Sequence, residues 1–96
     1  MPKKIDANQP KIVKVWRDIG AVWIPTSRDP TIGFDGIVIF RSRIYLVEIK
    51  NGELTLSARR LTDTERKRKA QVEASGVHYW IIEDADDALE MLGVRV

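Results

Sequence analysis

The sequence predicts a single α/β domain in which helices cover one sheet, with elements in the order αβββαβα. Its 96 residues can form one layered core but not two independent ones. A hydrophobic content of 44% beside 31% charged residues is typical of a folded globular chain. Helical apolar stripes alternate with short β-rich runs, and no repeat or linker interrupts them. We therefore expect one domain over residues 1–96.

The first half of the chain predicts a helix, a strand and a hairpin. A helix beginning near Ala7 is indicated by apolar residues at i, i+3, i+4 and i+7 before Gly20, namely Ile12, Val15, Trp16 and Ile19. Residues 21–25 form a short β-prone run that ends at a proline, and a turn-rich loop follows. The runs 34–40 and 43–50 are separated by little more than Arg41 and Ser42, which leaves room only for an antiparallel hairpin.

The second half predicts a helix, a strand and a last helix. After an exposed connection over residues 51–61, the segment "TDTE" (62–65) forms a capping box that begins a helix running to about Ser75. Residues 77–82 are β-rich. Asp84 is expected to cap a final helix that ends at Gly93 and packs on the core through Ala85, Ala88, Leu89 and Leu92.

Composition limits the possible compartments and partners. The chain has no cysteine, which excludes disulfides and thiolate metal sites and suits a reducing compartment. Residues 1–10 lack the apolar core of a secretion signal, and no run approaches the roughly 20 apolar residues that span a bilayer. We therefore expect a cytoplasmic protein with no membrane partner.

Charge is unevenly distributed, although the net charge is only +2. Residues 59–69 hold six basic and two acidic side chains, whereas residues 83–90 hold five acidic and none basic. This segregation is consistent with a phosphate-attracting face and equally with two solvated helix surfaces.

Three charges lie inside the most apolar segment. If residues 41 and 42 form the turn, Phe40 pairs with Arg43 and Asp35 pairs with Glu48. Opposed residues share a sheet face, and Lys50, two residues beyond Glu48, joins that face. Both faces of the hairpin are apolar, so we expect its strands to be covered on both sides. One face carries Ile37, Ile39, Ile44 and Leu46, and the other carries Val38, Phe40, Tyr45 and Val47.

Two opposed carboxylates at the end of a covered hairpin require compensation. A raised pKa, a salt bridge to Lys50 or a bound divalent cation would each supply it. A lone salt bridge needs only one carboxylate, whereas two carboxylates suit Mg²⁺, which keeps waters for substrate phosphates. A metal-binding carboxylate pair beside a lysine is suited to phosphodiester hydrolysis.

These residues are similar to those of a known family. Asp35 followed by "EIK" (48–50) on an αβββαβ scaffold resembles the PD-(D/E)XK nuclease superfamily. More closely, "DANQ", "GFDGIV", "YLVEIKNG" and "SARRLTDTE", in this order and spacing, resemble the small stand-alone VRR-NUC proteins often carried by phages.

The resemblance implies a restriction-endonuclease-like fold: an αβββαβ core with a C-terminal helix and a mixed central sheet flanked by helices. Asp35, Glu48 and the backbone carbonyl of Ile49 would bind Mg²⁺ or Mn²⁺, and Lys50 would position the attacking water. The implied activity is DNA endonuclease action on branched DNA such as four-way (Holliday) junctions, by a homodimer in the cytoplasm of a bacterial host, encoded by the host or by a phage.

The sequence departs from the family at several positions. Phe34 replaces the usual proline before the aspartate, and Gln9 stands where relatives often carry a metal-binding glutamate. Gln9 offers a neutral carbonyl, so a second metal would bind more weakly. Asp6 is a fallback ligand whose default role is a helix N-cap. Glu65 stands where relatives have glutamine, and its capping-box role is favoured over a site role.

Basic residues on both sides of the site are expected to contact DNA phosphates with little base readout. The candidates are Lys3, Lys4, Arg59, Arg60, Arg66 and Lys67. The apolar stripe of the second helix is thin, consisting mainly of Ala70, Val72 and Ala74, so we expect a second subunit to cover part of that helix.

Other residue types carry less functional signal. A lone His78 is more typical of a structural residue, and Trp16, Trp23 and Trp80 fall on expected core faces. The alternative function is a non-cleaving DNA-binding or assembly module on the same scaffold. A nuclease subunit that needs a partner for activity is a third possibility.

Overall fold

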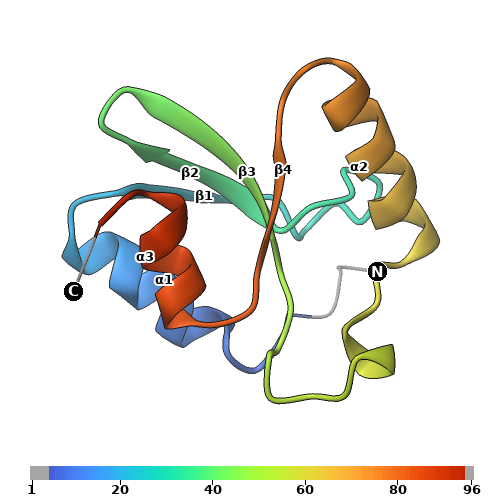
Figure 1. Ribbon diagram of the computed structural model, residues 1–96, viewed down its shortest axis with the longest axis horizontal. Coiled ribbons are helices and arrows are strands. Elements are labelled where there is room, and N and C mark those ends of the chain that lie inside the picture. Colours follow the sequence, from blue (N-terminus) through green and yellow to red (C-terminus); the bar gives the residue numbers. More distant parts are fainter. Residues whose placement is uncertain (1–4, 95–96) are drawn as a thin grey trace.

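A computed structural model of the protein describes residues 5–94 and has the expected order of helices and strands (Figure 1). Its elements are α1 (Gln9–Asp18), β1 (Val22–Pro25), β2 (Gly36–Phe40), β3 (Arg43–Ile49), α2 (Asp63–Ala74), β4 (Tyr79–Ile82) and α3 (Ala85–Met91). A 3-10 turn over Ser57–Arg59 lies in the connection that we expected to be exposed. No helix within residues 5–94 has the length and apolar character needed to cross a bilayer.

The sheet is mixed and has the strand order β1-β2-β3-β4. Its first three strands are antiparallel, and β4 pairs in parallel with β3 after the α2 crossover. The predicted hairpin register is confirmed, because Phe40 pairs with Arg43 across a two-residue turn. Both turn residues have positive φ, 49° at Arg41 and 66° at Ser42, which matches the right-handed twist of the strands.

The core lies between one face of the sheet and the pair α1 and α3 (Figure 1). Trp16 is fully buried; its indole N–H donates to the Ala88 carbonyl at 3.1 Å, and its ring stacks on Trp23 at a centroid distance of 5.4 Å. Val13 and Met91 join this core, although the expected helix stripes had omitted them. The core therefore fixes α1 and α3 on the same side of the sheet.

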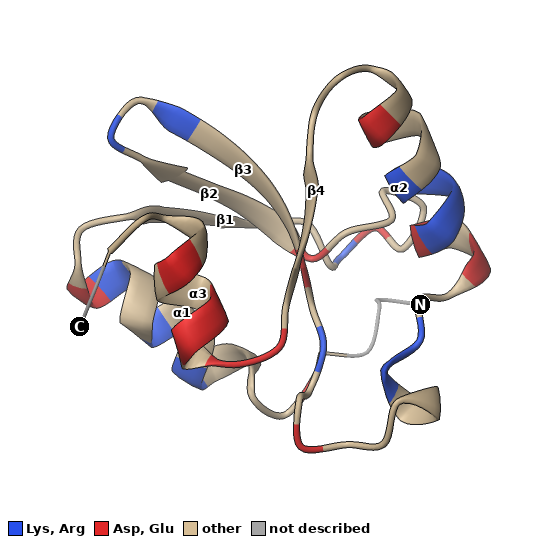
Figure 2. Cartoon of the chain, in the orientation of Figure 1, with Lys and Arg blue, Asp and Glu red and all other residues tan. Residues whose placement is uncertain are grey.

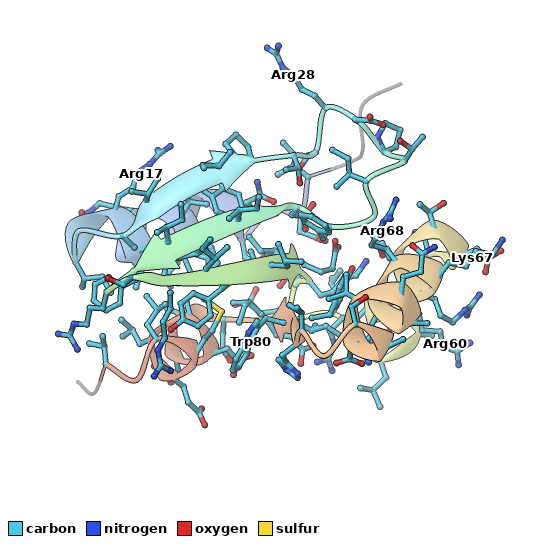
Figure 3. The ribbon with its side chains drawn as sticks, turned by 90° about the horizontal axis from the view of Figure 1, so that it is seen from above. Arg17, Arg28, Arg60, Lys67, Arg68 and Trp80 are labelled. Carbon is cyan, nitrogen blue, oxygen red and sulfur yellow. The ribbon has the colours of Figure 1, made fainter. Side chains whose placement is uncertain are left out.

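The opposite face of the hairpin is open, so the expectation that both faces are covered is wrong. Ile44 is 67% exposed on β3, and Ile24 is 43% exposed on β1. Seen from above, the sheet presents this face while α2 stands at one end of it (Figure 3). The reason is that α2 buries only one residue, the charged Glu65, and so has no apolar stripe with which to cover a sheet.

The helix starts follow local sequence signals with one exception. The predicted capping box is present: the Thr62 hydroxyl accepts from the Glu65 N–H, and the Glu65 carboxylate accepts from the Thr62 N–H. Asp84 caps α3 by accepting from the Asp87 N–H at 2.8 Å. Helix α1 instead begins after Asn8, so the N-cap role expected for Asp6 is wrong; the Asp6 backbone carbonyl accepts from the Gln9 N–H.

Candidate functional site

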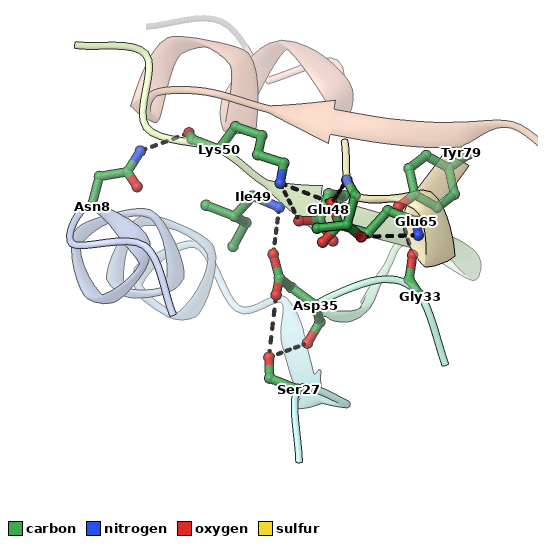
Figure 4. A network of polar contacts seen from close by, with 10 residues as sticks. Asn8, Ser27, Gly33, Asp35, Glu48, Ile49, Lys50, Glu65 and Tyr79 are labelled. Carbon is green, nitrogen blue, oxygen red and sulfur yellow. Dashed lines mark hydrogen bonds and ion pairs between the residues drawn. The ribbon is translucent and has the colours of Figure 1, made fainter. Parts of the chain in front are cut away.

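The three charges singled out in the sequence are brought together where β2 begins and β3 ends (Figure 4). Glu48 is 0% exposed, Asp35 is 2% exposed and Lys50 is 8% exposed. The Lys50 Nζ lies 3.4 Å from Glu48 Oε2. Charged groups this deeply buried need close partners, so the cluster is a specific arrangement and not a solvated strand end.

Asp35 is fixed by backbone and side-chain donors. Its Oδ2 accepts from the Ile49 N–H at 2.7 Å, and its Oδ1 accepts from the Ser27 hydroxyl at 3.3 Å. The N–H and C=O of one residue in an extended strand point to the same side. The Ile49 carbonyl therefore points to the side of β3 on which Asp35 lies, as the expected ligand set requires.

Glu65 belongs to the same cluster, although it comes from α2. It is 1% exposed, and its Oε1 accepts from Lys50 Nζ at 2.9 Å and from the Thr62 N–H at 2.9 Å. The predicted capping role is thus correct, and a role in the site accompanies it. The ammonium of Lys50 is held between two carboxylates, those of Glu48 and Glu65.

Tyr79 closes the cluster from β4. Its hydroxyl donates to the Gly33 carbonyl at 2.6 Å, and its ring is 1% exposed. Burial raises the pKa of Tyr79 well above its usual range, and the negative charges of Glu48, Glu65 and Asp35 raise it further. The three buried carboxylates therefore make the surroundings of this hydroxyl negative.

The buried groups include an excess of carboxylates within residues 5–94. The buried charged side chains there are Asp35, Glu48 and Glu65 against the single cation Lys50. Oxygen donors with a net negative charge suit a hard divalent cation that keeps part of its water shell. The described side chains form no group of three or more histidine, cysteine, aspartate or glutamate ligands, so a cation here would rely on backbone and amide oxygens as well.

Gln9 supplies such an oxygen at the start of α1. It is 6% exposed, and its Oε1 has no hydrogen-bond partner among residues 5–94. The preceding residue ties this helix start to the sheet, because Asn8 Nδ2 donates to the carbonyls of Lys50 at 3.1 Å and Glu83 at 3.0 Å. A buried amide oxygen next to the end of β3 fits the neutral ligand expected from the sequence.

No protein-family model matches the chain, and neither a curated protein nor a solved structure matches it. The likeness to VRR-NUC proteins therefore rests on the motifs, and the chemistry of this site has to be argued from its own residues.

The expected DNA-contacting residues differ in their surroundings. Arg60 and Lys67 are exposed and point outward near α2 (Figure 3). Arg66 is exposed but pairs with Asp63, and Arg59 is half-buried in an ion pair with Glu83 at 2.5 Å. Lys3 and Lys4 lie outside the described residues.

Arg68 is a structural cation that the basic run "RKRK" did not distinguish from its neighbours. Its Nε donates to the Ile32 carbonyl at 2.7 Å, and a terminal nitrogen donates to the Thr31 carbonyl at 3.1 Å. Figure 2 maps the basic and acidic residues within the described range 5–94. The side chains of α2 available for phosphates are therefore fewer than the run suggests.

A cleft of about 510 Å³ lies next to the first turn of α1. It is bordered by the start of α1, the loop over residues 51–53 and the junction between β4 and α3. Asn8 lines it and also bonds the Lys50 carbonyl, so the cleft adjoins the charge cluster without containing the carboxylates of Asp35 or Glu48.

Proposed function

We propose that the protein is a Mg²⁺- or Mn²⁺-dependent DNA endonuclease of the VRR-NUC type, with a restriction-endonuclease-like fold. It would hydrolyse phosphodiester bonds in branched DNA such as four-way junctions and act as a homodimer. The observation that carries this proposal is the buried convergence of Asp35, Glu48 and Lys50, with the Lys50 ammonium 3.4 Å from the Glu48 carboxylate.

Each residue has a role in this proposal. Asp35, Glu48 and the Ile49 carbonyl would hold the metal, with the Gln9 oxygen as a further neutral ligand. When bound, the metal supplies Lewis-acid polarisation of the phosphate and a more acidic water. Lys50 steadies the attacking water or the developing negative charge. Glu65 and Ser27 are positioning residues, because one holds Lys50 and the other holds Asp35.

The topology of the sheet supports the fold named in this proposal. A mixed four-stranded sheet, with an antiparallel hairpin followed by a parallel strand, is compatible with the αβββαβ core. The candidate site lies at the hairpin end on which α2 stands. Arg60 and Lys67 provide exposed cations on that side of the molecule for phosphates next to the scissile bond (Figure 3).

The alternative is a non-cleaving DNA-binding or assembly module. Two observations favour it: Gln9 lacks a charge, and Lys50 is engaged by Glu65 at 2.9 Å. A subunit that cuts only with a partner is the third candidate. Metal binding separates these functions, since a module that does not cleave has no need of a metal-binding carboxylate pair.

The first experiment is cleavage of labelled four-way junction, flap, single-stranded and linear duplex DNA with Mg²⁺ or Mn²⁺. We expect Asp35→Asn and Lys50→Met to abolish cutting. The matched surface variants Asp86→Asn and Lys14→Met should keep it, because both residues are exposed on helices packed against the other face of the sheet. Cleavage that survives in Asp35→Asn, with no dependence on metal, contradicts the proposal.

Direct metal titration of the DNA-free protein completes the test. Mn²⁺ binding that is lost in Asp35→Asn and Glu48→Gln supports the site even if the native protein needs a partner for cutting. Tight junction binding with neither metal binding nor cleavage establishes the binding-module alternative.

A further inference from the structure

The loop that joins β1 to β2, residues 26–35, is tied closely to the candidate site; we call it the β1–β2 loop. Its two ends are held together, since the Thr26 N–H donates to the Asp35 carbonyl at 2.8 Å and the Thr26 hydroxyl donates to the Phe34 carbonyl at 2.7 Å. The Ser27 hydroxyl donates to the Asp35 carboxylate at 3.3 Å (Figure 4). The loop thus contains a proposed metal ligand and the residue that positions it.

The same loop is fastened to α2 and β4 through three successive backbone carbonyls. Arg68 of α2 donates to the carbonyls of Thr31 at 3.1 Å and Ile32 at 2.7 Å. The Tyr79 hydroxyl of β4 donates to the Gly33 carbonyl at 2.6 Å. Gly33 has a φ of 83°, and a Cβ there would lie 2.6 Å from the Cβ of Arg68, so only glycine allows this close packing. These contacts determine where the loop lies relative to α2.

Arg28 is presented to solvent by this loop, directly after Ser27. It is exposed and projects away from the body of the molecule (Figure 3). No ion pair joins it to a carboxylate of residues 5–94. The neighbouring Asp29 is engaged within the loop, because its Oδ1 accepts from the N–H of Thr31 at 2.9 Å and from its hydroxyl at 2.6 Å. The Arg28 guanidinium is therefore available to an anionic ligand.

We infer that the β1–β2 loop is a second phosphate-binding arm, in which the Arg28 guanidinium binds the DNA backbone. The inference rests on the proposed function, because it takes DNA as the ligand. A guanidinium fits a phosphate through two parallel hydrogen bonds. Such a contact fixes the position of a strand and carries no sequence information. Arg28 would therefore help to place the scissile phosphate over the site without reading bases.

This arm lies on the other side of the charge cluster from the cations near α2. The cluster lies between the β1–β2 loop, which carries Asp35, and α2, which contributes Glu65 (Figure 4). Arg28 projects from the loop, whereas Arg60 and Lys67 project near α2 (Figure 3). A strand that crosses the site would therefore meet cations on both sides of the bond that is cleaved.

Arg68 connects the two sides. Its donors are directed to loop carbonyls, so it acts as a positioning residue for Arg28 and not as a phosphate ligand. An arm that is already in place before DNA arrives loses less conformational entropy on binding. The contribution of Arg28 to DNA affinity should therefore depend on Arg68.

The first test is binding of a labelled four-way junction to the full chain in EDTA, measured by fluorescence anisotropy over a series of salt concentrations. We expect Arg28→Ala to lower the slope of log affinity against log salt by about one unit, because one phosphate contact is lost. Arg28→Lys keeps the charge and should keep most of the slope. The matched control is Arg17→Ala, an exposed arginine near the end of α1, which should leave the slope unchanged (Figure 3).

The second test combines substitutions. In an Arg68→Met background, Arg28→Ala should change the slope by roughly half or less of its effect in the native chain, because residues that act through shared contacts are coupled. Arg28→Ala and Arg60→Ala should be additive, since the two residues are held by different elements. Circular dichroism verifies the fold of each variant. Additive effects of Arg28→Ala and Arg68→Met would overturn the positioning role of Arg68.

The outcomes separate this inference from the nuclease proposal. Metal-dependent cutting by the native chain, with an unchanged salt slope in Arg28→Ala, overturns the arm and leaves the nuclease proposal standing. Junction binding that depends on Arg28, without cleavage in Mg²⁺ or Mn²⁺, supports the arm and contradicts the nuclease proposal. Equal losses in Arg28→Ala and Arg17→Ala would indicate diffuse attraction and overturn the arm, as would a native chain that binds none of the DNA structures.

Discussion

One oxygen of Glu65 joins two parts of the molecule, since it accepts from the Thr62 N–H and from Lys50 Nζ. In Glu65→Gln the amide oxygen still accepts from Thr62, whereas the buried ammonium loses a charged partner. We expect a destabilisation of about 1–3 kcal/mol, because hydrogen bonds to charged buried groups have that magnitude. Thr62→Ala removes only the cap and should cost about 1 kcal/mol.

Urea unfolding of these two variants measures the difference. A cost for Thr62→Ala equal to or greater than that for Glu65→Gln would show that Glu65 acts only as a helix cap and that its contact with Lys50 adds little.

Tyr79 makes the stability of the protein sensitive to alkaline pH. Burial holds its pKa in the folded state above the ordinary value of 10.0, which the unfolded chain regains. The stabilising contribution is therefore fully present below pH 10 and decreases as the pH rises above it, because only the unfolded state then releases the proton.

Tyr79→Phe should remove this alkaline decrease. It should also lose about 1 kcal/mol at neutral pH with the hydrogen bond to Gly33. Urea unfolding on both sides of pH 10 checks both effects; parallel losses in the two proteins as pH rises would assign the alkaline decrease to another group.

At the residue scale, the sequence predicted the convergence of Asp35, Glu48 and Lys50 because a two-residue turn and a period of two determine which residues are opposed. It did not predict Ser27 and Tyr79, and for Glu65 it favoured the capping role over the site role that the structure adds to it. Their contacts join segments far apart in the chain. The spacing of nearby residues in the sequence does not determine where a loop or a crossover helix packs.

Helix α2 is attached to the rest of the molecule mainly by polar contacts. It buries only Glu65, whereas α1 buries Ile12, Val13 and Trp16 in the core. Regions with few buried apolar contacts open at lower free energy. We expect the amides of α2 to exchange with deuterium before those of α1, and Lys50→Met to accelerate exchange in α2 while leaving α1 unchanged. Equal protection of the two helices would contradict this expectation.

The hairpin turn carries backbone strain. Ser42 has a φ of 66°, in the left-handed region that costs a residue with a side chain roughly 1 kcal/mol. Ser42→Gly should therefore raise the free energy of unfolding by about 0.5–1 kcal/mol, measured by urea unfolding at low protein concentration. Destabilisation instead would mean that the flexibility of glycine in the unfolded chain outweighs the relieved strain.

At the element scale, the capping box, the Asp84 cap and the strand register followed from signals a few residues long. The coverage of the sheet by helices did not follow from such local signals. Alternating aliphatic residues on both faces predicted a doubly covered hairpin, but coverage depends on whether another element carries an apolar stripe, and α2 does not.

If the protein binds DNA as proposed, its exposed and paired cations predict how the DNA affinity depends on salt concentration. Arg60 is exposed, and Arg60→Ala should lower the slope of log affinity against log salt by about one unit, because one phosphate contact is lost. Arg59 already pairs with Glu83, so Arg59→Ala should mainly reduce stability and leave the slope nearly unchanged.

Junction binding measured over a series of salt concentrations tests this assignment. A large change of slope in Arg59→Ala, with none in Arg60→Ala, would reverse it and would mean that the Arg59–Glu83 pair opens on the DNA.

The strand order of the whole molecule determines when the candidate site is completed during folding. The antiparallel strands β1, β2 and β3 are joined by local connections and pair early, which brings Asp35 and Glu48 together. Pairing of β4 with β3 requires closure of the long crossover that contains α2, and only then does Glu65 reach Lys50. We therefore expect the carboxylate pair to form in the fast part of folding and the contact of Glu65 with Lys50 in the slow part, so a chain emerging from the ribosome would lack this arrangement until β4 has been synthesised.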